Sequence, residues 1–176
     1  MNTQNNEALT LDVKFKVKDV LRYNASVARK NIVNCLIIAL GLGVLVYFFY
    51  KMFTSGERMD IFVARHIVLL VVPVLIFIMI PWRVWKITLT QMQQPAFAYG
   101  VVYTFSKEHI VLDIGEASEA INWDVFAKII ETKNDFRFYV NHISAQIIPK
   151  HNMTSEQLQE LRKMIGEVAP DRSQLR

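Results

Sequence analysis

Side chains that could carry out chemistry are few in this chain, and they lie far apart along it. Three histidines fall in separate predicted turns of the C-terminal half: His109, His142 and His151. The carboxylates nearby lie around predicted strand ends: Asp113, Glu116, Glu119 and Asp124. The single cysteine, Cys35, lies inside an apolar run, where a thiolate nucleophile is unfavourable. No Walker loop, GxSxG or HExxH sequence occurs. The pattern predicts no catalytic residue, no cofactor and no metal site, and so no enzyme.

Two long apolar runs dominate the first half of the chain, Ile32 to Tyr50 and Ile61 to Trp82. Each is close to the roughly 20 residues that a helix needs to cross about 30 Å of hydrocarbon. We therefore expect two transmembrane helices, at 31–53 and 61–82, joined by an external loop at 54–60. A pair of buried core helices is the alternative, but two neighbouring helices that are apolar on all sides would be unusual in so small a soluble domain.

The positive charge is concentrated on the open side of this hairpin. Residues 11–30 carry four more basic than acidic side chains, and Arg83 and Lys86 follow the second run. By the positive-inside rule, this asymmetry places both termini in the cytoplasm. Beside a membrane, attraction to lipid headgroups explains such cations better than nucleic-acid binding does. The candidate headgroup contacts are Lys14, Lys16 and Arg22, and no nucleic-acid partner is expected.

The second run contains three residues that are unusual inside a membrane: Arg65, His66 and Pro73. Arg65 lies near the external loop, so its side chain can extend along its aliphatic stem to the outer headgroups. A role for Arg65 and His66 in binding an ion or a partner is the alternative. Pro73 removes a helical hydrogen bond and predicts a kink.

The soluble part begins with a strand that has no neighbour in the sequence. Apolar and polar residues alternate over 9–17, which is typical of a half-buried strand. An amphipathic helix follows at 18–30, which completes an N-terminal segment of residues 1–30. After the hairpin, an amphipathic connector at 83–97 leads to a domain at 98–168, and residues 169–176 form a tail.

Six short strands are predicted within this C-terminal domain. They lie at 99–105, 110–114, 117–123, 128–132, 136–140 and 143–147, the last closed by Pro149. A helix follows, with a capping box of Thr154 and Gln157 and an apolar stripe. We expect an α+β membrane protein in which the two-helix hairpin is inserted into a small antiparallel β domain. This domain is a sheet or a partly open barrel, the strand at 9–17 supplies its missing edge, and the C-terminal helix caps it.

Several short sequences in this domain resemble the YcxB-like family of bacterial membrane proteins, from about residue 99 to 166. They are Tyr103-Thr-Phe-Ser-Lys-Glu-His-Ile110, Ile121-Asn-Trp-Asp124, Glu131-Thr-Lys133 and Ile148-Pro-Lys150. The resemblance implies a pleckstrin-homology-like fold in the bacterial inner membrane and supplies no catalytic residue. Trp123 is expected to anchor a corner between strand and turn. Pro149 and Lys150 are expected to end the last strand and to set the approach to the helix.

Three classes of function follow from this interpretation. The first is a membrane-anchored binding module, facing the cytoplasm, for a protein or a lipid headgroup. The second is an immunity or resistance protein that neutralises a membrane-acting toxin, which small two-span proteins suit. The third, an enzyme, lacks a visible nucleophile–base pair or metal cluster. The bilayer is the expected partner in the first two classes, together with a protein or a toxin.

Overall fold

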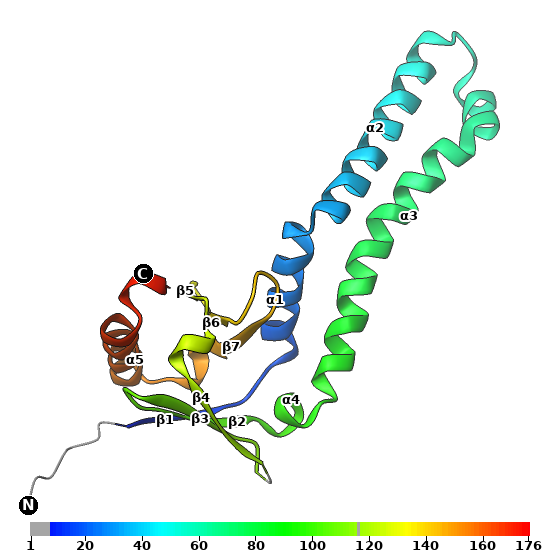
Figure 1. Cartoon of the computed structure of the whole chain (residues 1–176). Helices are drawn as coiled ribbons and strands as arrows, with labels where there is room; N and C mark the ends of the chain where they lie inside the picture. Colours follow the sequence, from blue (N-terminus) through cyan, green and yellow to red (C-terminus); the bar gives the residue numbers. More distant parts are fainter. Residues whose placement is uncertain (1–7, 116) are drawn as a thin grey trace, which may run out of the picture. The chain divides into compact units, whose positions relative to one another are not determined.

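The computed structural model describes residues 8–115 and 117–176, so Glu116 lies outside the described residues. By their contacts these residues divide into two compact units (Figure 1). The β unit comprises residues 8–20 and 90–176, and the helical unit comprises residues 21–89. The β unit is thus assembled from both sides of the helical unit in the sequence.

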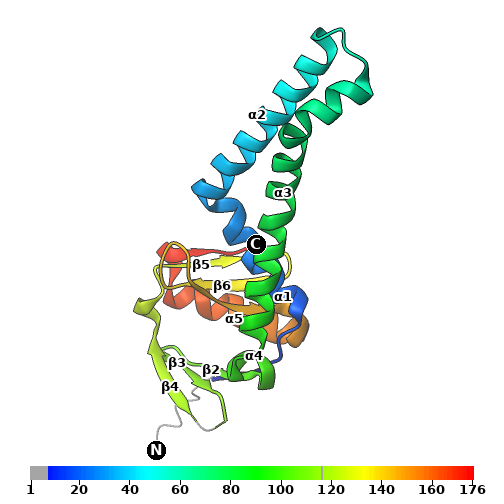
Figure 2. The ribbon, with the colours of Figure 1, turned by 90° about the vertical axis from the view of Figure 1, so that its right-hand side faces the viewer.

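The β unit contains two four-stranded sheets (Figure 2). The first has the order β1 (Leu9–Val13), β2 (Val101–Phe105), β3 (His109–Asp113) and β4 (Ser118–Asn122). The second has the order β7 (Ala145–Pro149), β6 (Asp135–Tyr139), β5 (Lys128–Glu131) and β8 (Ser173–Gln174). Neighbouring strands are antiparallel, except that β5 and β8 are parallel.

The sequence predicted one small antiparallel β domain capped by a helix, and the structure divides its strands between two sheets. A short 3₁₀ helix, η1 (Trp123–Val125), separates β4 from β5 and takes the chain from the first sheet to the second. Residues 169–176 are more than a tail, because they form a 3₁₀ helix, η3 (Pro170–Arg172), and β8. Arg172 Nη2 lies 2.8 Å from Asp124 Oδ1, and Arg176 N donates to Glu131 Oε2 at 2.8 Å. Partners distant in sequence thus hold this segment in place.

The strand predicted at 9–17 is present as β1, but it is shorter. It pairs with β2 over its whole length, from Leu9 opposite Phe105 to Val13 opposite Val101. Beyond Val13 the chain leaves the sheet, because the side chain of Asn152 bonds the backbone of Lys14 at both N and O, at 3.3 and 3.2 Å.

Helix α1 (Val17–Lys30) begins where the sequence predicted the end of that strand. Asp19, in its first turn, accepts a hydrogen bond from Lys16 N at 3.1 Å, which favours helix initiation over a longer strand.

The first strand of the C-terminal domain also begins later than predicted. Residues before it form the short helix α4 (Pro95–Tyr99), and β2 starts at Val101. Gly100 joins the two with φ 94°, in the left-handed region, and a Cβ atom there would lie 2.8 Å from Val13 O. Only glycine fits this junction between β1 and β2.

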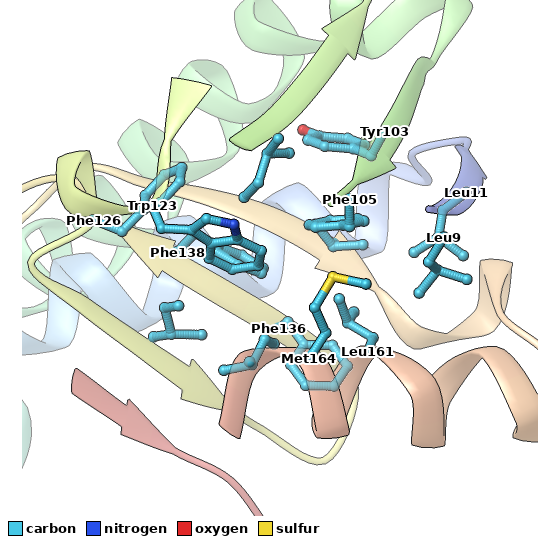
Figure 3. Close-up of a cluster of buried hydrophobic side chains, with 14 of the residues drawn as sticks. Leu9, Leu11, Tyr103, Phe105, Trp123, Phe126, Phe136, Phe138, Leu161 and Met164 are labelled. Atoms are coloured by element: carbon cyan, nitrogen blue, oxygen red, sulfur yellow. The ribbon is translucent and has the colours of Figure 1, made fainter. Parts of the chain in front are cut away.

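One hydrophobic core joins both sheets to helix α5 (Ser155–Val168), and Figure 3 shows its aromatic centre. The ring centroid of Phe138 in the second sheet lies 6.0 Å from that of Phe105 in the first and 6.3 Å from that of Trp123. Leu161 and Met164 contribute from α5. Each large side chain buried here stabilises the fold by about 1.5–3 kcal/mol.

The predicted start and apolar face of α5 are confirmed. Thr154 Oγ1 accepts a hydrogen bond from Gln157 N at 3.2 Å, and Gln157 Oε1 accepts one from Thr154 N at 3.0 Å. This reciprocal pair satisfies two donors at the helix start. Leu161, Met164 and Ile165 are buried in the core.

The helical unit consists mainly of two long helices, α2 (Ile32–Thr54) and α3 (Met59–Met92), preceded by most of α1. Asn31 separates α1 from α2 and caps α2, since its Oδ1 accepts from the backbone N of Val33 and Asn34 at 3.0 and 3.2 Å. Residues 83–92, predicted as part of a connector, continue α3, because no glycine or proline interrupts them.

The break in α3 lies at His66 and not at Pro73. His66 has non-helical dihedral angles, φ −112° and ψ 22°, and Figure 1 shows the helix bending near its start. The His66 ring stacks on Phe62, with centroids 4.3 Å apart. Arg65 pairs with Glu57 in the connecting loop, which supplies a local partner for the charge.

Both α2 and α3 are long and apolar enough to cross a membrane. Within the unit, Phe48 of α2 and Phe62 of α3 are buried with ring centroids 5.5 Å apart. Most other large apolar side chains of these helices point outward: Leu36 is 64% exposed and Leu40 66%. The two helices therefore pack through a narrow strip and expose the rest of their apolar surface.

Candidate functional site

The three candidate headgroup contacts, Lys14, Lys16 and Arg22, do not belong to a single site. Lys14 and Lys16 are exposed on the segment between β1 and α1, and Lys14 Nζ lies 3.9 Å from Asp12 Oδ2. Arg22 belongs to the helical unit and is half-buried. Lys14 and Lys16 thus keep their charges at the surface of the β unit, while Arg22 lines a groove among the helices.

A buried charge cluster lies around Glu131, which the sequence indicated only as part of the Glu131-Thr-Lys133 motif that resembles the YcxB-like family. Its carboxylate is buried and accepts hydrogen bonds from Lys150 Nζ at 2.5 Å and from Arg162 Nη2 at 2.6 Å. Lys150 Nζ also donates to Thr132 O at 2.7 Å and lies 5.2 Å from the centroid of the Phe136 ring. Lys150 therefore joins β5 to the end of β7, a larger role than ending a strand.

The pKa of Glu131 reflects this surrounding charge. Burial acts to raise the pKa, but hydrogen bonds from Arg162, Lys150 and the backbone N of Arg176 outweigh it and lower the pKa to about 2. The group is thus ionised throughout the physiological range. With its charge fully matched by fixed cations, Glu131 acts as a structural ion-pair centre and not as a proton donor or acceptor.

Trp123 and Pro149 belong to other motifs that resemble the YcxB-like family, and both have structural roles. Trp123 is buried at the corner where β4 meets η1, and its Nε1 donates to Ser106 O at 2.9 Å. Ser106 also closes the turn between β2 and β3, since its Oγ donates to His109 O at 2.7 Å. Pro149 is the last residue of β7 and lies opposite Asp135 of β6. These residues support the fold.

The titratable residues near the turns have separate partners. Asp113 Oδ1 accepts from Gly115 N at 2.8 Å, Asp124 pairs with Arg172, and His151 Nε2 lies 2.8 Å from Asp19 Oδ2. Among the described residues, no three His, Cys, Asp or Glu side chains gather as a metal site would require. The absence of catalysis stays a prediction.

The outer face of the first sheet carries mostly exposed side chains. Two rows of paired residues cross it: Thr10, Thr104, Val111 and Ala120, then Asp12, Val102, Asp113 and Ser118. Most of these side chains are exposed, and they are small or β-branched. The face carries two carboxylates, Asp12 and Asp113, in the second of these rows.

The two edges of this sheet differ. The edge at β1 is covered, because Asn152 bonds the backbone of Lys14 and Gln157 Nε2 lies 3.5 Å from Thr10 O. The edge at β4 has no further strand among the described residues. Residues 108–124, which include β4, contain five acidic residues and no Lys or Arg. An uncovered strand edge can pair with another chain, and this one is acidic.

Comparison with known proteins agrees with the resemblance found in the sequence. Residues 105–165 match the family model described as YcxB-like protein. The match spans the β unit from the end of β2 into α5, and β1 and the helical unit lie outside it. No curated protein and no solved structure matches the chain.

Proposed function

We propose that this chain is a membrane-anchored binding protein of the bacterial inner membrane, without catalytic activity. The helical unit crosses the bilayer twice, and both termini and the β unit are cytoplasmic. The observation that carries the proposal is the outward-facing apolar surface of α2 and α3, which water would not tolerate over two whole helices.

The orientation is supported by charge. Basic residues flank the open ends of the helices, whereas the connecting loop balances its cations with acids: Arg58 pairs with Asp60 at 2.9 Å, and Arg65 pairs with Glu57. Alkaline phosphatase fused at Arg176 should be inactive and the same enzyme inserted in the 54–60 loop should be active. High activity from the Arg176 fusion would reverse the proposed topology. Extraction of the chain by carbonate without detergent would refute insertion.

We infer that the β unit is a pleckstrin-homology-like binding module. Support comes from the order of its elements, a four-stranded meander, then the antiparallel strands β5 to β7, then a helix packed on both sheets through the core. The proposed ligand is an extended, basic segment of a partner protein, which pairs with β4. Main-chain hydrogen bonds to the β4 edge would give affinity, and carboxylates such as Asp113 and Glu119 would select basic side chains.

Charge reversal tests this binding surface. The full-length chain in detergent, with a photocrosslinker at Ala120, should form an adduct with a protein whose crosslinked peptide is basic and extended. Asp113→Lys combined with Glu119→Lys should abolish the adduct. Glu160→Lys, a single charge reversal on the exposed side of α5, is the control and should preserve it. Equal yields from the double variant and the control would exclude the acidic edge as the binding surface.

A further inference from the structure

A groove runs between α3 and the junction of α1 with α2, and it lies wholly within the helical unit. Its volume is about 810 Å³. The side chains that define it are Ala25, Arg29, Ile38, Ala39, Leu42 and Ile80, and we call it the Arg29 groove. Small residues on α1 and α2 leave the space, because alanine is too short to reach across to α3.

The groove changes character along its length. Ile38, Ala39 and Leu42 belong to α2, which begins at Ile32, so they lie within the apolar stretch. Arg29 lies in the last turn of α1, just before Asn31 separates the two helices. One end of the groove is therefore apolar and the other cationic, which is the order of groups along a phospholipid.

The charges of the helical unit favour an anionic ligand at this end. The unit contains only two acids, Glu57 and Asp60, and both lie at the opposite end, paired with Arg65 and Arg58. The residues that line the groove include no carboxylate. Among the described residues, no ion pair joins Arg29 to an acid. A zwitterionic headgroup would bring its ammonium group to cations alone, whereas an anionic headgroup would meet complementary charge.

We propose that the Arg29 groove binds one anionic phospholipid, with its phosphate at Arg29 and an acyl chain along Ile38, Ala39 and Leu42. This inference rests on the proposed membrane insertion, because only an inserted helical unit would meet a lipid in this orientation. It goes beyond the binding function proposed for the β unit, since lipid would occupy a defined site between helices.

Native mass spectrometry of the full-length chain, released from detergent, tests the headgroup. With phosphatidylglycerol and phosphatidylcholine supplied separately, we expect one molecule of phosphatidylglycerol to bind at least about fivefold more tightly. Arg29→Gln should weaken phosphatidylglycerol binding about fivefold and phosphatidylcholine binding by less, because the choline ammonium offsets the phosphate charge. Arg58→Gln removes the same charge at the opposite end and should change neither. Equal binding of the two lipids, or equal losses in both variants, would overturn the proposal.

A second measurement tests the acyl chain. Ala39→Phe fills the groove and should reduce phosphatidylglycerol binding, whereas Val46→Phe, on an exposed position of α2, should not. Cys35 also lines the groove and is the only cysteine of the chain, so bound phosphatidylglycerol should slow its reaction with a maleimide. Unchanged binding by Ala39→Phe would overturn the acyl-chain contact.

The two proposals can fail separately. A chain that stays in membranes through carbonate extraction but does not discriminate between the lipids refutes the groove site alone. A chain that carbonate extracts refutes membrane insertion and the groove site together.

Discussion

The β unit and the helical unit place the same kinds of residues in opposite environments. In β1, Leu11 is 1% exposed, whereas Leu36 and Leu40 of α2 are 64% and 66% exposed. Leaving a large apolar side chain in water costs about 1.5–3 kcal/mol relative to burying it. Apolar content alone therefore does not distinguish a buried core from an outward-facing apolar surface, because the direction of the side chains decides it.

The charged residues show the same contrast. In the β unit, the buried Glu131 is matched by Lys150 and Arg162, whose contacts bring β5, β7 and α5 together. In the helical unit, Glu57 pairs with Arg65 and Asp60 pairs with Arg58, both beside the loop that joins α2 to α3. Internal ion pairs thus stabilise the β unit, and we propose that the surrounding lipid stabilises the helical unit.

The largest effect should come from placing the same aspartate in each unit. Val13→Asp buries an unpaired carboxylate in the core of the β unit and should destabilise it by about 4 kcal/mol or more. Limited proteolysis of the full chain should then cleave within residues 99–166. Phe15→Asp, which removes a ring 4.9 Å from Phe97, should act in the same direction more weakly.

Val46→Asp is the counterpart in α2, where the side chain is 69% exposed. An exposed position in water would tolerate it, but a lipid-facing one should lose about 2.5–3.5 kcal/mol of insertion free energy. We expect less protein in the membrane fraction, with residues 99–166 still protease-resistant. A Val46→Asp variant that inserts as well as wild type would remove the contrast between the units.

The next effect concerns the Glu131 ion-pair centre. Its pKa is lowered from 4.5 to about 2 in the folded chain, so its ionised form stabilises the fold above about pH 4.5. This contribution, on the order of 3 kcal/mol, is lost as pH falls toward 2. Urea unfolding should show Glu131→Gln to be less stable at pH 7 by a similar amount and less sensitive to acid.

Glu160→Gln, on the exposed face of α5, is the control for Glu131→Gln and should change the free energy of unfolding little. If the two variants unfold at the same urea concentration, the ion-pair centre contributes nothing to stability.

A smaller effect is expected from the basic residues near the start of α1. Lys14, Lys16 and Arg22 should each add about 1 kcal/mol of attraction to an anionic surface, less for Lys14 because Asp12 lies 3.9 Å away. Replacing all three by Gln should lower the fraction of full-length chain that incorporates into vesicles containing phosphatidylglycerol, and added salt should lower wild-type incorporation likewise. Equal incorporation at low salt would show that these residues make no headgroup contact.

The smallest effect is expected from removing the helix cap at the start of α5 in the β unit. Thr154→Ala removes the side-chain acceptor for Gln157 N at the start of α5 and should cost about 1 kcal/mol. Urea unfolding of the β unit should shift accordingly, while membrane incorporation should stay unchanged. A loss of membrane incorporation would show that the two units are not independently stabilised.

The local features of this protein could be predicted from its sequence alone. Periodicity predicted β1, because alternation of apolar and polar residues has one structural meaning whatever the partner strand. The sequence also predicted the capping box of Thr154 and Gln157, the apolar stripe on α5 and the two apolar helices. Each of these features depends on residues close together in the sequence. The short motifs shared with the YcxB-like family predicted a domain at about 99–166, and residues 105–165 match that family model, since each motif is a contiguous stretch of sequence.

The way in which these elements join depends on contacts between residues far apart in the sequence. The division into two sheets, the addition of β8 and the end of β1 at Val13 depend on contacts such as those of Asn152 and Arg172, far away in the sequence. Glu131 became a buried centre because cations from β7's end and α5 reach it, and no local pattern predicts such convergence. The Arg29 groove likewise exists only because α3 passes opposite small residues of α1 and α2.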